Sequence, residues 1–385
     1  MIVRHIILFV LLVVLPYFWV DYFYWRIQRQ PAWRRVLWWL PSLFVLGFTA
    51  AMARVHDFIP QERVWIDFYI LLLGLLVIPV AFFCISSAIG WLCHSFKRCS
   101  LWADRVGIIL GLIAAGLYVY SFTAGFNKVE TKYLELSFKN LPAEFDGCRI
   151  VHVSDLHVGT YGGWRKPVLE AVVDSIKKQN ADYVFFTGDL QNTRPREIEK
   201  VKDVLNRLPH VYSILGNHDH SAYAGRSAED KKQVEEGLRA AEQQLGWTLL
   251  VNSVVVLRKT PESKDSILLV GLDNDGEPPF PSLADYSIAP LQGRTSFTIL
   301  LQHDPSAWRR NILQKTTAEL TLSGHTHGGQ FGWGDVRLTK LRTNEDKGLY
   351  QEGGRYLYVN SGAGALMPVR LGIPNEITVI TLRKR

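Results

Sequence analysis

Apolar and polar residues follow two different patterns along this chain of 385 residues. Up to about residue 127 the apolar residues form long blocks, and a helix needs about 20 such residues to cross a bilayer. Four blocks reach or approach that length, at 6–25, 36–52, 66–93 and 106–122. Beyond residue 127 the apolar runs are short and separated by polar, glycine-containing stretches. We therefore expect an all-α transmembrane region of about four helices at 1–127 and a separate domain at 128–385.

The distribution of charge supports this division. Residues 1–127 contain ten Lys or Arg and five Asp or Glu, a balance of +5, whereas residues 128–385 contain 33 and 31, a balance of +2. Basic residues beside long apolar blocks indicate membrane orientation, and no nucleic-acid-binding module is recognisable, so we expect no nucleic-acid partner. The first block lacks a small-residue cleavage site, which favours a retained span over a signal peptide.

Loop charges predict an orientation. The most basic loops lie between the first and second blocks, with Arg34 and Arg35, and between the third and fourth, with Lys97 and Arg98. The positive-inside rule assigns these loops to the cytoplasm. With an even number of spans, the domain after residue 127 is then extracytoplasmic, although Lys128 and later lysines weigh against this orientation.

The second domain begins with strands and helices in alternation. Its first part predicts strands at 131–138, 149–154, 183–186 and 210–215 and helices at 166–179, 195–208 and 227–245. Its second part predicts mainly strands, at 248–257, 267–272, 297–302, 320–322, 356–359 and 377–382. This order favours an α/β layered domain in which two sheets pack face to face with helices outside.

Clusters of polar residues follow five of the predicted strands directly. They are Asp155 and His157, then Asp189, then Asn217, His218 and Asp219, then His303, and finally His325 and His327. Each cluster alone is more often a turn or a helix cap. Strand ends of one direction meet at one sheet edge, so five clusters in series indicate a shared metal site. Carboxylate, amide and imidazole ligands suit Mn, Fe or Zn better than Mg or Ca.

These motifs, in this order, resemble the calcineurin-like metallophosphoesterase superfamily. The likeness covers about residues 130–385 and consists of Asp-x-His, Gly-Asp, Gly-Asn-His-Asp, His and Gly-His-x-His. The segments Gly-His-Thr-His-Gly-Gly-Gln at 324–330 and Tyr-Val-Asn-Ser-Gly-Ala-Gly at 358–364 are similar to its membrane-tethered bacterial branch. The resemblance implies a four-layered αββα sandwich, two divalent metal ions and a place in the bacterial inner (cytoplasmic) membrane.

The resemblance also implies a role for each residue. One metal ion would be held by Asp155, His157, Asp189 and His327, and the other by Asp189, Asn217, His303 and His325. Asp189 would bridge the two ions. His218 would face the phosphate, where it stabilises the transition state or protonates the leaving oxygen, with Asp219 holding its ring in one tautomer.

We accordingly expect a membrane-anchored hydrolase of a phosphodiester, pyrophosphate or phosphomonoester bond, which is broken by attack of a metal-bound hydroxide. The membrane anchor favours a lipid-linked substrate, and a soluble phosphate ester is the alternative. A different class of function is a non-catalytic sensor that binds metal or ligand and signals through the membrane helices.

Three other residues carry expectations. His152, within a strand, is expected to be a core histidine, and His220 to lie at the rim of the site. Arg370 is expected either near the mouth of the site, against an anionic substrate, or on the surface in solvent.

Overall fold

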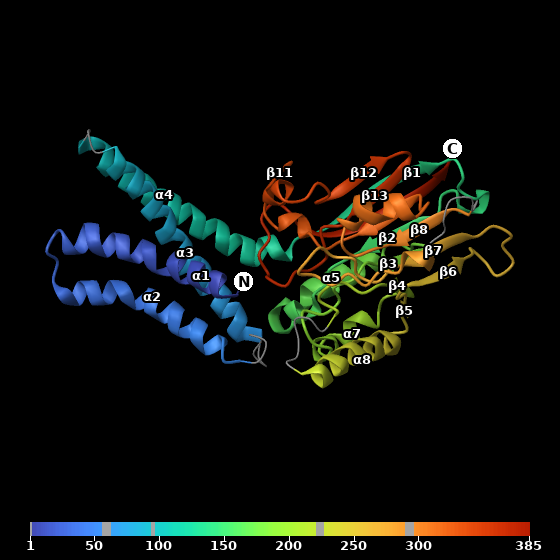
Figure 1. Cartoon of the computed structure of the whole chain (residues 1–385), viewed down its shortest axis with the longest axis horizontal. Helices are drawn as coiled ribbons and strands as arrows, with labels where there is room; N and C mark the ends of the chain where they lie inside the picture. The colour runs from blue at the N-terminus through green and yellow to red at the C-terminus, as the bar shows by residue number, and fades with distance from the viewer. Residues whose placement is uncertain (1, 56–62, 94–96, 221–226, 289–295) are drawn as a thin grey trace. The chain divides into compact units, whose positions relative to one another are not determined.

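The computed structural model describes residues 2–55, 63–93, 97–220, 227–288 and 296–385. The chain divides into two compact units, Met1–Ala124 and Gly125–Arg385. Figure 1 shows the first as long helices and the second as strands with helices beside them. We call them the helical unit and the α/β unit.

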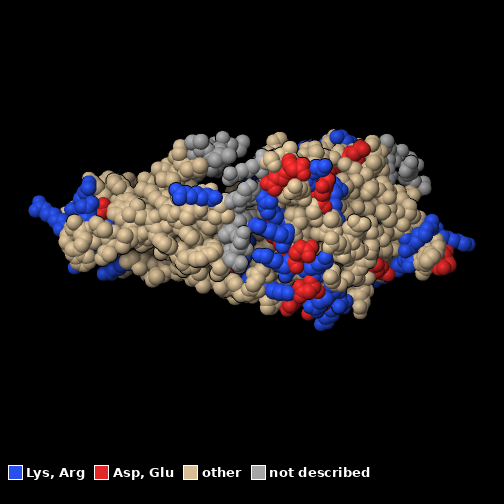
Figure 2. Space-filling model, turned by 90° about the horizontal axis from the view of Figure 1, so that it is seen from below, with Lys and Arg blue, Asp and Glu red and all other residues tan. Residues whose placement is uncertain are grey.

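The helical unit contains the four expected helices. They are α1 (Ile2–Val20), α2 (Ala32–Met52), α3 (Arg63–Leu92) and α4 (Lys97–Tyr120), with α1 and α4 continuing into the π-helical segments η1 (Asp21–Arg26) and η3 (Ser121–Gly125). Each contains a segment long and apolar enough to cross a membrane, and each predicted apolar block falls on one of them. The face of this unit that Figure 2 shows is mostly uncharged. The structure thus agrees with the expected membrane-spanning region.

Small residues let α3 and α4 pack closely. A Cβ added at Gly74 would overlap the ring of Tyr118, and one at Gly111 would lie 2.9 Å from the carbonyl oxygen of Pro79. The Tyr118 hydroxyl donates a hydrogen bond of 2.7 Å to the carbonyl oxygen of Ile70. Close backbone approach and interhelical hydrogen bonds of this kind hold helices together in lipid, where the hydrophobic effect cannot.

The α/β unit contains two six-stranded sheets. The first has the order β1 (Val129–Phe138), β14 (Asn375–Lys384), β2 (Arg149–Val153), β3 (Tyr183–Phe186), β4 (Val211–Ser213) and β5 (Thr248–Leu249). The second has the order β12 (Gly348–Glu352), β13 (Arg355–Val359), β9 (Leu320–Ser323), β8 (Thr298–Leu301), β7 (Ile267–Gly271) and β6 (Ser253–Leu257). Strands β2 to β5 run parallel, as do β13, β9, β8 and β7. Their carboxyl ends therefore collect at one edge of each sheet.

Side-chain alternation along the strands produces the layers. In β2, Ile150 packs between the two sheets, whereas Val151 and Val153 pack on the outer face of the first sheet. The helices α5 (Lys166–Lys177), α6 (Arg196–Glu199), α7 (Lys202–Leu205) and α8 (Ala228–Gln244) cover that outer face. Figure 1 shows α5, α7 and α8 along one side of the strands. On the far side, Trp308 of η9 (Trp308–Ile312), which continues into α9 (Leu313–Lys315), covers the second sheet. The predicted αββα sandwich is confirmed.

Two predicted elements are wrong in detail. The single strand expected at 248–257 is two strands, β5 in one sheet and β6 in the other. Asn252, at φ 46°, turns the chain between them, and asparagine tolerates this left-handed backbone better than most residues. The helix expected at 195–208 is broken at Val201, which has φ −129°. Apolar spacing did not reveal the break because Ile198, Val201 and Leu205 are all buried on the same side.

Two further features were not predicted from sequence. Strand β12 forms the edge of the second sheet, and a hairpin of β10 (Gly332–Trp333) and β11 (Val336–Arg337) precedes the turn η11 (Leu338–Leu341).

Candidate metal centre

The loops after β2, β3, β4, β8 and β9 bring together all seven residues predicted as ligands. Their ligand atoms form two groups, Asp155 with His157 and His327, and Asp189 with His303 and His325, each with its atoms within 4.8 Å of one another. Asn217 joins the second group, because its Oδ1 lies 2.7 Å from the Nδ1 of His325 and 3.1 Å from the Nε2 of His303. Five of the seven are buried, and His325 and His327 are partly exposed.

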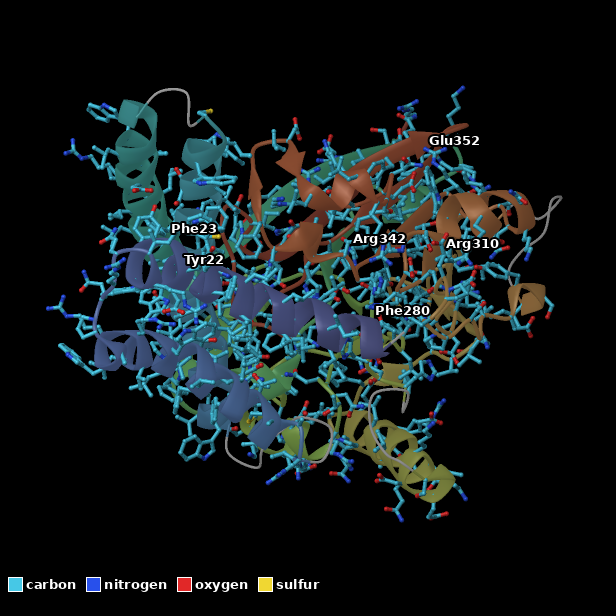
Figure 3. The ribbon with its side chains drawn as sticks, turned by 60° about the vertical axis from the view of Figure 1, so that its left-hand side comes forward. Tyr22, Phe23, Phe280, Arg310, Arg342 and Glu352 are labelled. Atoms are coloured by element: carbon cyan, nitrogen blue, oxygen red, sulfur yellow. The ribbon has the colours of Figure 1, made fainter. Side chains whose placement is uncertain are left out.

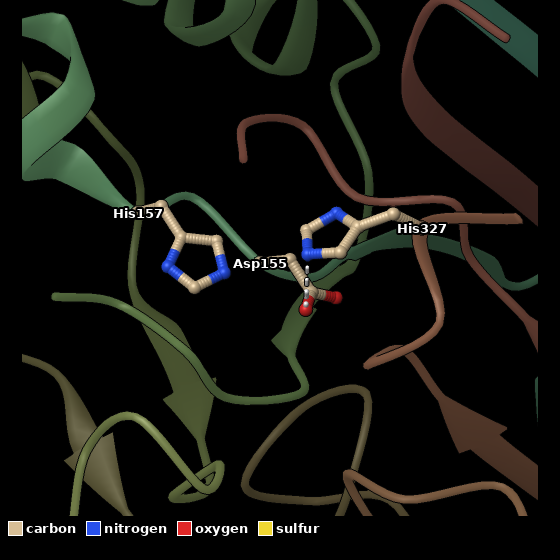
Figure 4. A group of neighbouring side chains, drawn as sticks. All are labelled: Asp155, His157 and His327. Carbon is tan, nitrogen blue, oxygen red and sulfur yellow. Dashed lines mark ion pairs between the residues drawn. The ribbon is translucent and has the colours of Figure 1, made fainter. Parts of the chain in front are cut away.

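The first group surrounds the carboxylate of Asp155. The Nε2 of His327 lies 3.5 Å from the Oδ1 of Asp155, and the rings of His157 and His327 are 5.3 Å apart (Figure 4). The Nε2 of His157 also lies 3.5 Å from the Oδ2 of Asp189.

Asp189 connects the two groups. Its Oδ2 lies 3.5 Å from the Nε2 of His157 in the first group and 3.3 Å from the Nε2 of His303 in the second. The resemblance predicts a bridging ligand at this residue, and the carboxylate has the reach for that role.

Backbone strain is concentrated at this site. Nine non-glycine residues in the part of the chain that the structure describes have positive φ, and five of them are candidate ligands: Asp155, His157, Asp189, His325 and His327. Such conformations cost about 1–3 kcal/mol each and persist where the surroundings fix them, most often at functional sites. Neighbouring glycines make room for these turns. A Cβ at Gly324 would overlap the Oδ2 of Asp155, and one at Gly216 would overlap the Oδ1 of Asp189.

Hydrogen bonds orient the candidate ligands. The Nδ1 of His303 donates to the carbonyl oxygen of Thr187 at 2.7 Å, which leaves its Nε2 facing Asp189. The backbone N–H of His325 donates to the Oδ2 of Asp155 at 3.0 Å, and that of His218 donates to the Oδ1 of Asp189 at 2.8 Å. Such partners fix the direction in which ligand atoms point.

Burial and charge perturb the acidity of the group. Burial raises the pKa of Asp155 to about 6 and lowers the pKa of His157 to about 3. Burial also opposes the charged forms of His303 and Asp189, but their mutual attraction outweighs it. The pKa of His303 rises to about 10, and the pKa of Asp189 stays well below its usual range, with His218 also contributing. Buried carboxylate oxygens beside imidazole nitrogens are a donor set that a divalent cation stabilises, so the residues fit the metal that the resemblance implies.

The surroundings of His218 correct one prediction. Its Nδ1 lies 2.8 Å from the carbonyl oxygen of Asn192, so a backbone group fixes its tautomer. Asp219, predicted to hold that ring, instead accepts backbone N–H bonds from Asp189 at 2.6 Å, Gly216 at 2.9 Å and Leu190 at 3.0 Å. Asp219 therefore holds the loop that carries Asp189. The two residues are close in sequence, but the turn at Gly216 directs the carboxylate toward these amides.

Arg370 corrects a second prediction, because it is neither at the mouth of the site nor in solvent. It is fully buried, and its Nη2 donates to the carbonyl oxygens of Ser361 at 2.9 Å and Gly362 at 3.1 Å. The same nitrogen lies 3.5 Å from the Nδ1 of His327. Arg370 thus holds the loop after β13 against His327. His152 is a buried core residue, as expected, with its Nε2 2.9 Å from the Oγ1 of Thr187.

A pocket of about 900 Å³ opens beside His325. Phe280 packs its ring edge-on to His325 at 4.9 Å, and Leu338 also lines the pocket. Arg310 pairs with Asp275 at 3.3 Å, whereas Arg342 has no carboxylate partner within the residues that the structure describes. Figure 3 labels Phe280, Arg310 and Arg342, which lie in three different segments of the chain. No sequence motif marks these residues, which is why they were not predicted.

A family model matches part of this chain, and several known proteins are similar to it. The family described as Calcineurin-like phosphoesterase matches residues 148–329. The uncharacterised metallophosphoesterase YkuE of Bacillus subtilis is 31% identical over 290 residues, which cover 71% of this chain and 92% of YkuE. A transmembrane protein with metallophosphoesterase domain from Danio rerio is 28% identical, covering 73% of this chain and 63% of that protein. The UDP-2,3-diacylglucosamine pyrophosphatase LpxG of Chlamydia trachomatis is 26% identical, covering 63% of this chain and 86% of LpxG.

The matched region includes Asp155, Asp189, Asn217, His303 and His325, each at the end of a strand of the sandwich. The similarity to YkuE extends over nearly all of that relative. Sequence and fold therefore agree that this chain is a hydrolase and belongs to the calcineurin-like phosphoesterase family.

Proposed function

We propose that the protein hydrolyses a phosphate ester or pyrophosphate bond of a lipid-linked substrate at a centre of two divalent cations. The observation that carries this proposal is the convergence of two ligand groups on Asp189. Beside them lies a pocket that is lined both by an arginine side chain and by apolar side chains. Residues 1–127 would anchor the catalytic domain, 128–385, in the inner membrane with that domain outside the cytoplasm.

Each candidate ligand keeps the role that the resemblance implies. Asp155, His157, Asp189 and His327 would hold one cation, and Asp189, Asn217, His303 and His325 would hold the other. Cations of the Mn, Fe or Zn kind, when bound, lower the pKa of a water and offset the negative charge of a phosphoryl group. His218, with Nδ1 fixed by the Asn192 carbonyl, presents Nε2 as the group that stabilises the phosphoryl oxygens or gives a proton to the leaving oxygen.

The pocket favours a substrate with both charged and apolar parts. Arg342 is available to a phosphate that is not transferred, because no carboxylate in the described part of the chain neutralises it. Phe280 and Leu338 offer apolar contact for a hydrocarbon portion. The name of LpxG, a pyrophosphatase of a diacylated sugar nucleotide, supports a lipid-linked substrate.

Turnover of bis(4-nitrophenyl) phosphate by the full chain with added Mn²⁺ tests the metal centre. Asp189→Asn removes the shared carboxylate, and we expect a loss above the ~10–100-fold typical of an outer hydrogen-bonding partner. Asp203→Asn is the matched control, because Asp203 pairs with Lys166 on the surface. Full turnover in Asp189→Asn, with metal bound, would contradict the mechanism. Metal binding without turnover in the unsubstituted chain would favour the sensor instead.

A lipid-extract screen tests the substrate class. We expect the purified protein to release phosphate or a phosphorylated head group from a fraction of the lipids, and Asp189→Asn to release neither. Hydrolysis of soluble esters alone would refute the lipid-linked substrate and leave the hydrolase intact.

A further inference from the structure

The most exposed apolar side chains of the α/β unit lie in one short segment. Within the residues that the structure describes, its four most exposed large hydrophobic residues are Trp333 at 89%, Leu341 at 86%, Val336 at 77% and Leu338 at 76%. They fall within nine residues, on the β10–β11 hairpin and η11. We call residues 331–342 the apolar hairpin segment. The surface of a soluble protein rarely exposes a cluster of large apolar side chains unless the cluster is an interaction site.

Hydrogen bonds and an ion pair hold the backbone of the apolar hairpin segment in place. The backbone N–H of Gly332 donates to the carbonyl oxygen of Leu371 at 2.9 Å. The Nε of Arg337 pairs with the buried carboxylate of Asp346 at 2.6 Å, and the Thr339 hydroxyl donates to the same carboxylate at 2.8 Å. These bonds fix the inner side of the segment, so the apolar side chains are held outward.

Basic residues accompany the apolar ones. Lys340 lies 3.9 Å from Asp335, a contact too long for strong pairing, and Arg342 has no carboxylate partner among the described residues. A tryptophan, aliphatic residues and basic side chains together are typical of surfaces that enter the interface of an anionic bilayer.

We propose that the apolar hairpin segment docks on the bilayer in which the chain is anchored. Trp333, Val336 and Leu341 enter the boundary between head groups and acyl chains, and Lys340 lies among the phosphates. Only residues 126–128 separate η3 from β1, and three residues span at most about 10 Å, so the α/β unit stays within reach of the membrane surface.

The docking surface continues into the pocket, because Leu338 and Arg342 line the pocket and belong to the apolar hairpin segment. A lipid phosphoester can therefore pass from the leaflet toward His325 without entering bulk water. This second step rests on the proposed function, whereas docking itself does not.

Photocrosslinking of the full chain in proteoliposomes tests the docking. The vesicles contain phosphatidylethanolamine and radiolabelled phosphatidylglycerol, and benzoylphenylalanine replaces Trp333, Leu341 or Val256 in separate variants. Val256 is the control, because it is 52% exposed on β6, at the opposite edge of the second sheet from β12. We expect at least tenfold more lipid label at positions 333 and 341 than at position 256.

Equal labelling at the three positions, or crosslinks from 333 and 341 to a second protein chain, overturns the proposal. The readout needs no turnover, so it is independent of the proposed function. Trp333→Ser and Leu341→Ser lie outside the pocket and should retain hydrolysis of bis(4-nitrophenyl) phosphate, which shows that the fold is intact. A loss of that activity would assign the segment to the catalytic site and contradict a docking role.

Discussion

Gly362, in the loop after β13, offers a sharp test of how tightly the metal centre is packed. Its φ is +80°, and an added Cβ would lie 2.8 Å from the Nδ1 of His327 and 2.9 Å from the Cβ of Asp155. Contacts under 3.0 Å force atoms to move. The Gly362→Ala substitution should therefore displace two candidate ligands of one cation.

Gly354 provides a matched control. Its φ is also +80°, but it is exposed in the turn between β12 and β13, and nothing lies within 4 Å of an added Cβ. Alanine in this left-handed conformation costs about 1–2 kcal/mol. Both variants should lose at least that amount of unfolding free energy, and any further loss in Gly362→Ala isolates the crowding at the ligands.

The measurements are the Mn²⁺ dependence of phosphodiester turnover and the thermal midpoint with and without Mn²⁺. We expect Gly354→Ala to keep the metal affinity of the unsubstituted protein and Gly362→Ala to lose about 10–100-fold, the range typical when ligand orientation is disturbed. Stabilisation by added Mn²⁺ should fall correspondingly. Equal metal affinities in the two variants would refute the reasoning.

Two further predictions concern buried ionisable residues. Burial raises the pKa of Glu242, on α8, from 4.5 to about 8, so the folded state keeps a proton that the unfolded state releases. Its contribution is fully present below pH 4.5 and is lost as pH rises through about 8, by up to about 1.4 kcal/mol per pH unit. Denaturant unfolding from pH 5 to 9 should show this fall, Glu242→Gln should flatten it, and surface Glu236→Gln should leave it unchanged; an equal slope in Glu242→Gln would refute it. Arg370→Met should lower the unfolding free energy by roughly 3 kcal/mol, because it strips donors from buried carbonyls of Ser361 and Gly362, and should also weaken Mn²⁺ binding in a metal titration. Unchanged metal affinity would limit Arg370 to stability alone.

The sequence was most informative where a chemical motif directly followed a strand. Ile150 to Val153 identify a buried strand, and the abrupt change to Asp155 and His157 marks its carboxyl end. The same logic located Asp189 and His303, and parallel strands then bring such residues together.

What the sequence could not reveal depends on backbone groups and on segments without motifs. The carbonyl oxygen that orients His218 belongs to Asn192, and any residue type supplies a carbonyl. The enclosure of Arg370 is likewise made of carbonyl oxygens. The pocket residues Phe280 and Arg342 come from loops distant in sequence, and only the folded chain places them together.

The division of the candidate ligands between the two sheets affects more than catalysis. Asp155, Asp189 and Asn217 follow strands of the first sheet, whereas His303, His325 and His327 follow strands of the second. Cations at this edge would link the first sheet to the second, in the way that structural ions join separate parts of a fold. Metal supply would then govern how long the folded protein survives in the cell, as well as how fast it works.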